Sequence, residues 1–253
     1  MTTSHDEDQG DLKVSDRSKN DWSNESRSRL LAEAAGFLVT IGFANVIHAK
    51  KISNRSALAM GIAIQTAGDL SRGIRNLIED KNFYSAATLA RQVLETTQLI
   101  KYFQLSPDRA EFWLTASDSD MRNASDFKPG SLRRATHSSD RMYSTHCLMG
   151  GHPRAAARHL LPGSPWRKAN DIIDVATQDG AKISADLKAL LLTDALQHVY
   201  ETVLAAIETL DIEAINGFGP LEKTVTQRTD DLVRNLVCWR DQDPLARVGT
   251  IGV

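Results

Sequence analysis

The chain has 253 residues, of which 42% are hydrophobic and 25% are charged, and its formal net charge is −2. These values are ordinary for a globular protein and argue against a strong electric field over the whole surface. The two cysteines, Cys147 and Cys238, are too few for a disulfide framework, so we expect a reducing, cytoplasmic compartment.

Aromatic residues make up only 6% of the chain, so alanine, leucine, isoleucine and valine must build the core. Such side chains suit closely packed helices, and no segment shows the alternating pattern of a β-strand. We therefore predict an all-α, single-domain antiparallel helical bundle over residues 21–243. Residues 1–20 are predicted to be a disordered N-terminal tail and residues 244–253 a C-terminal tail.

Apolar residues recur at helical spacing in the first half of the chain and predict three long helices. The first covers about residues 23–51, the second follows a turn and predicted N-cap among Ser53, Asn54 and Ser56 and ends near residue 79, and the third covers about 84–104. Within the first helix, residues 34–49 include no Asp, Glu, Lys or Arg. A membrane span needs about 20 apolar residues, so we predict a buried core helix and no membrane partner.

The second half of the chain alternates between clear and interrupted helical patterns. Ser106 and Pro107 give a strong helix start, because proline is favoured at the first helical position. Proline and glycine pairs then break residues 127–168 into short pieces. The predicted helices cover about residues 107–126, 131–149, 153–161, 166–178, 186–214 and 221–241.

The third predicted helix carries a polar stripe on an otherwise apolar surface. A helix that is apolar on most sides is buried, and a buried arginine or glutamate needs a partner. The stripe therefore predicts either a structural ion pair between Arg91 and Glu95 or a polar pocket that binds a ligand. Its members are Tyr84, Arg91, Glu95, Gln98 and Tyr102.

Residues 122–168 give the strongest compositional signal. Nine basic residues against two acidic ones give this segment a charge of +7, so the rest of the chain sums to −9. The asymmetry predicts an anionic partner, either nucleic acid or another phosphorylated anion, unless the arginines only neutralise the acidic helices around them. The predicted ligand-binding residues are Arg91, Glu95, Tyr102, His152 and Arg154.

Two catalytic alternatives use histidines of this segment. Four residues separate Arg141 from His146, and we expect both near one helix face, where they would cleave RNA without a metal. This alternative needs both side chains to face an open cleft or a dimer groove, and it fails if His146 is buried and hydrogen-bonded. The other alternative is a metal-dependent hydrolase that uses Glu95, His146 and His152. No HExxH or CxxC pattern occurs, so we predict no metal and no cofactor.

Three segments carry a resemblance to known proteins. They are Tyr84 to Glu95 with Tyr102 after it, the Trp113 segment up to Phe127-Lys-Pro129, and Tyr143 to Pro153. Together, across about residues 60–210, they resemble a family of mostly bacterial all-α proteins defined as a domain of unknown function. The resemblance implies the fold and a recurring polar set of Arg91, Glu95 and His152, but no activity.

Arg141 and His146 also match the R-x4–6-H motif of the HEPN superfamily, to which the chain is more loosely similar. Met142 departs from that motif, which usually has a polar residue after the arginine. The similarity implies a helical bundle, often dimeric, with metal-independent RNase activity. We therefore expect a helical-bundle protein that binds an anion or a partner through a polar Arg/Glu/His pocket, with a HEPN-like endoribonuclease as the alternative and homodimerisation left open.

Overall fold

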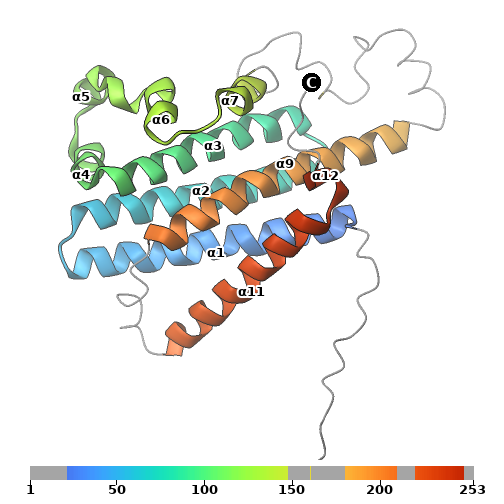
Figure 1. Ribbon diagram of the computed structural model, residues 1–253, viewed down its shortest axis with the longest axis horizontal. Coiled ribbons are helices and arrows are strands. Elements are labelled where there is room, and N and C mark those ends of the chain that lie inside the picture. Colours follow the sequence, from blue (N-terminus) through green and yellow to red (C-terminus); the bar gives the residue numbers. More distant parts are fainter. Residues whose placement is uncertain (1–21, 148–159, 161–179, 210–219, 248–253) are drawn as a thin grey trace, which may run out of the picture.

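The structure is a computed structural model that describes residues 22–147, 160, 180–209 and 220–247 (Figure 1). Every regular element in these residues is a helix, which confirms the predicted all-α class. The predicted tail at 1–20 and the predicted helices at 153–161 and 166–178 lie outside the described residues, apart from the buried Leu160.

Three long helices lie side by side with alternating direction (Figure 1). They are α1 (Asn24–Lys51), α2 (Arg55–Glu79) and α3 (Phe83–Leu105), close to the predicted ranges. Each begins after a serine or asparagine whose side chain accepts a hydrogen bond from a backbone N–H of the first turn. Capping satisfies a donor that the helix itself leaves unpaired, which explains why the helices start where they do.

The contact between α1 and α2 depends on glycine. A Cβ atom at Gly42 would lie 2.5 Å from the backbone nitrogen of Gln65, and one at Gly61 would lie 2.9 Å from the Gly42 oxygen. The two backbones therefore approach more closely than any larger residue allows. By length and composition α1 could cross a membrane, and in the structure it packs against α2, α9 and α11.

Helix α9 (Gly180–Thr209) lies across α1, α2 and α3 and completes the core (Figure 1). Helix α11 (Pro220–Gln242) crosses α1 and is followed by the short α12 (Pro244–Arg247), in a region predicted to be a tail. The buried Asp243 between these two helices accepts hydrogen bonds from Arg27 Nε and Nη2 at 2.7 and 2.8 Å. This ion pair fastens the C-terminal helices to the start of α1.

A layer of short helices covers the outer side of α3 (Figure 1). The helices predicted at 107–126 and 131–149 are each broken in two. A capping box at Ser117 and Asp120 starts a new helix in the first, and His137, with φ of 52°, interrupts the second. These breaks let the chain turn back over α3. The layer consists of α4 (Pro107–Thr115), α5 (Asp118–Asn123), η1 (Ser125–Phe127), α6 (Pro129–Ala135) and α7 (Asp140–His146).

Candidate functional site

The polar stripe of α3 meets α7 at a cluster formed by Arg91, Glu95 and Tyr143. Arg91 Nε donates to Glu95 Oε1 at 2.9 Å, and Arg91 Nη2 donates to the Tyr143 hydroxyl at 2.9 Å. The Tyr143 hydroxyl in turn donates to Glu95 Oε1 at 3.0 Å. The Arg91 and Glu95 side chains are 20% and 30% exposed, so the predicted ion pair forms but is only partly buried.

Electrostatics keeps this arginine–tyrosine cluster in one protonation state. Burial raises the pKa of Tyr143, and the Glu95 carboxylate raises it further. The phenol therefore stays protonated and acts as the donor to Glu95. Burial alone would lower the pKa of Arg91, but Glu95 raises it overall, so the guanidinium keeps its charge.

A second arginine, Arg133 of α6, reaches the same tyrosine. Its Cζ lies 3.8 Å from the centroid of the Tyr143 ring, and the Arg91 Cζ lies 5.2 Å from that centroid. Arg133 Nε donates to Asp140 at 2.7 Å, and the Arg133 side chain is 16% exposed. Its Nη1 is buried and has no hydrogen-bond partner among the residues that the structure describes. A charged donor without an acceptor is unusual in a protein interior.

One helical turn beyond Tyr143, His146 enters the core and meets two residues of α9. The His146 and His198 Nε2 atoms lie 2.7 Å apart, and Asp194 Oδ1 lies 3.5 Å and 3.6 Å from them. The side chains of this histidine–aspartate triad are 6%, 0% and 6% exposed for His146, His198 and Asp194. Asp194 and His198 face the same side of α9 because they are four residues apart.

The pKa values of the triad shift in opposite directions. Burial lowers the pKa of His198 to about 4, so this imidazole is neutral at pH 7. Burial alone would lower the pKa of His146, but attraction to Asp194 raises it overall. Burial alone would raise the pKa of Asp194, but attraction to the two histidines lowers it overall. The triad therefore combines a carboxylate with one basic and one neutral imidazole.

The structure brings together part of the predicted binding set. Arg91 and Glu95 meet as expected, but Tyr102 belongs to a separate group, where its hydroxyl donates to Asp126 at 2.9 Å beside Arg109. His152 and Arg154 lie outside the described residues. Gln98, between the two groups on α3, is 1% exposed, and neither of its amide atoms has a hydrogen-bond partner.

The predicted Arg141 and His146 pair does not share one face. Arg141 is exposed, whereas His146 is 5% exposed and bonded to His198. The physical reason is the spacing, because five positions on an α-helix turn the side chain by about 140°. The condition set for the RNA-cleaving alternative is therefore not met. The metal set of Glu95, His146 and His152 does not form among the described residues either, since Glu95 bonds Arg91 and Tyr143.

Sequence reasoning missed Arg133 as an individual site residue, and Tyr143, Asp194 and His198. A signal for the last two was present in the sequence of α9. Asp194 and His198 are four residues apart inside the apolar run from Leu190 to Val199, and buried polar residues at that spacing share a face. Tyr143 and Arg133 gave no comparable signal, because their partners come from other helices.

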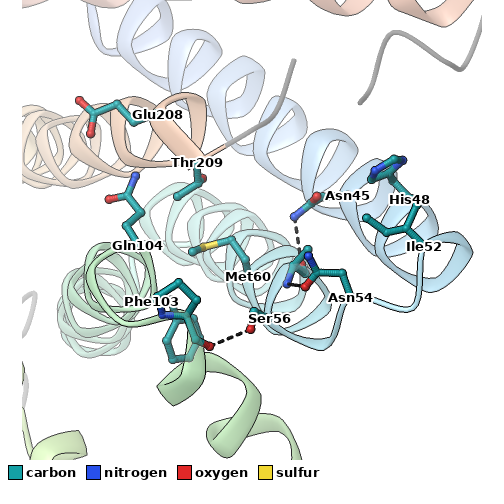
Figure 2. A pocket seen from close by; sticks show the side chains of 12 residues that line it. Asn45, His48, Ile52, Asn54, Ser56, Met60, Phe103, Gln104, Glu208 and Thr209 are labelled. Carbon is teal, nitrogen blue, oxygen red and sulfur yellow. Dashed lines mark hydrogen bonds between the residues drawn. The ribbon is translucent and has the colours of Figure 1, made fainter. Parts of the chain in front are cut away.

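The structure also has a pocket of about 440 Å³ at the opposite end of α3, where α1, α2, α4 and α9 meet (Figure 2). Its polar side chains largely serve the fold. Asn45 donates to the Ala57 oxygen, Ser56 to the Pro107 oxygen and Gln104 to the Ala205 oxygen. We therefore place the candidate site at the α3–α7–α9 centre, where polar groups lack partners.

Comparisons of the chain with protein-family models, with curated proteins and with solved structures found no match.

Proposed function

We propose that the protein is a binding module for a small phosphorylated anion. Arg91 of α3 and Arg133 of α6, which flank Tyr143, recognise this anion. The observation that carries the proposal is the buried Arg133 Nη1, which has no hydrogen-bond partner in the described part of the chain. An unsatisfied buried donor costs about 1–3 kcal/mol, and more when it is charged. An anionic oxygen at this position would remove that cost.

The chemistry of the guanidinium favours phosphate as the bound group. Arginine stays charged at all physiological pH values and presents several N–H groups in a planar fork that fits phosphate oxygens. Each arginine already has one carboxylate partner, Glu95 for Arg91 and Asp140 for Arg133. These carboxylates hold the guanidinium groups in place, and among the described residues the buried Arg133 Nη1 has no acceptor and is available to a ligand.

The depth of the cluster favours a small ligand over nucleic acid, because the Arg91 and Arg133 side chains are only 20% and 16% exposed. An RNA surface would rely on exposed arginines and aromatics. The covering layer instead carries exposed charges of both signs, with Arg122, Lys128, Arg134 and Arg141 beside Asp108, Glu111, Asp118, Asp120 and Asp140.

Calorimetric titration of the purified protein with inorganic phosphate and pyrophosphate at low salt tests the proposal. The informative variant is Arg133→Gln, and the matched control is Arg134→Gln, which changes the exposed neighbour on the same helix. We expect binding by the wild type and the control and at least about a tenfold weaker affinity for Arg133→Gln, the loss of one charged hydrogen bond. Equal affinities for the two variants, or no binding by the wild type, would contradict the proposal.

A further inference from the structure

We infer that His146, Asp194 and His198 hold one divalent transition-metal ion, such as Zn²⁺ or Fe²⁺. This site is separate from the arginines proposed to bind the anion and does not depend on them. It lies one turn further along α7, at its contact with α9. Two imidazoles and one carboxylate are a common donor set for these metals.

The distances between the three donor atoms fit a single ion. The triangle formed by His146 Nε2, His198 Nε2 and Asp194 Oδ1 has sides of 2.7, 3.5 and 3.6 Å. The point equidistant from its corners lies about 1.9 Å from each, and zinc binds nitrogen and carboxylate oxygen at about 2.0–2.2 Å. An ion slightly above the plane of the three atoms therefore reaches all of them without movement of the backbone.

The distances to Asp194 favour a metal over a shared proton, although either would place positive charge beside the carboxylate. A proton between the two Nε2 atoms would explain their 2.7 Å separation. It would leave Asp194, which is 5% exposed, with no hydrogen bond of normal length among the described residues, because both imidazoles are at least 3.5 Å away. A buried carboxylate without such a bond is costly. A cation satisfies all three side chains together.

The His198 Nδ1 atom is buried and has no partner among the described residues. Histidines that bind metals usually donate this second N–H to another group. In the metal-free protein the same N–H is unpaired if His198 Nε2 accepts from His146, and Nδ1 carries no hydrogen if His198 Nε2 donates.

Zinc titration of protein stripped with EDTA and then freed of the chelator tests this inference. We expect one ion per chain in the wild type, and at least about a tenfold loss of affinity in His198→Gln and in Asp194→Asn, since even outer partners of a metal ligand contribute about 10–100-fold. His48→Gln on α1, outside the triad, serves as the control and should bind like the wild type. Unaltered zinc affinity in both triad variants, or no binding by the wild type, would overturn the inference.

A second measurement uses only the wild type and therefore stands even if the variants fail to fold. Cobalt(II) added to the stripped protein should give ligand-field bands without a thiolate charge-transfer band, because the three ligands supply nitrogen and oxygen. A thiolate band would overturn the assignment, since it would place a cysteine on the metal. Phosphate binding measured in EDTA separates the two proposals. If the protein binds phosphate but does not bind zinc, only the metal inference is overturned.

Discussion

The Nε2 atoms of His146 and His198 lie 2.7 Å apart, although the two residues are 52 positions apart in the sequence. This contact joins the last turn of α7 to the middle of α9 inside the core. It therefore fixes the end of the covering layer on the bundle and brings the arginine–tyrosine cluster next to the histidine–aspartate triad.

The triad makes stability depend on pH in metal-free protein. The pKa of His198 falls from 6.5 in the unfolded chain to about 4 in the folded one, so the unfolded state binds more protons between these values. His198 thus contributes stability above pH 6.5, and that contribution, up to about 3 kcal/mol, is lost as the pH falls towards 4. Burial lowers this pKa and His146 lowers it further, whereas Asp194 and Glu201 oppose the fall.

Urea unfolding in EDTA at several pH values checks this dependence. The wild type should lose more stability than His198→Gln as the pH falls from 6.5 to 4. The raised pKa of His146 acts in the opposite direction, since its contribution is present at low pH and is lost as the pH rises through its folded pKa. Parallel curves for the two proteins would show that His198 is not held neutral.

Replacing Tyr143 with phenylalanine should weaken the arginine–tyrosine cluster but keep its aromatic ring in place. The change removes the hydrogen bonds to Arg91 and Glu95 but keeps the ring that Arg133 contacts. We expect unfolding free energy to fall by about 1–3 kcal/mol, because partly buried charged groups lose a partner. Tyr200→Phe is the control, since its hydroxyl accepts from the exposed Arg240, and an equal loss there would count against the cluster.

The Asp243 carboxylate should be among the most important polar groups for stability. It accepts from Arg27, from Trp239 Nε1 at 2.9 Å and from the Leu245 N–H at 3.0 Å, and its side chain is 0% exposed. Asp243→Asn leaves Arg27 buried without its counter-charge, which costs about 3–5 kcal/mol. Chemical denaturation should show a loss below about 0.5 kcal/mol for Asp69→Asn, whose pair with Arg72 is exposed.

Two glycines of α1 provide a matched test of the α1–α2 contact. Gly42→Ala places a Cβ 2.5 Å from the Gln65 nitrogen, so the helices must separate, and we expect a loss of at least about 1–3 kcal/mol. Gly36→Ala meets nothing within 4 Å and should stabilise α1 by about 0.5–1 kcal/mol. Thermal unfolding of both variants measures the difference, and similar melting temperatures would contradict the close packing.

The long helices were predictable because their apolar spacing and capping residues are local signals. The Arg91 and Glu95 contact was predictable for the same reason, since helical spacing alone brings the two residues together. The covering layer was not predictable in the same way. The turn at His137 depends on a single positive φ angle that no neighbouring residue requires. Asp194 and His198 carried a local signal in their spacing, but the triad was missed because His146 reaches them only through the contact of α7 with α9, which no local pattern encodes.

The position of the metal can be measured directly by anomalous scattering at the zinc absorption edge, on crystals grown with zinc. We predict one strong peak about 2 Å from His146 Nε2, His198 Nε2 and Asp194 Oδ1. A triad without a peak, with the two imidazoles still in contact, would show that a proton joins them and would contradict the metal site.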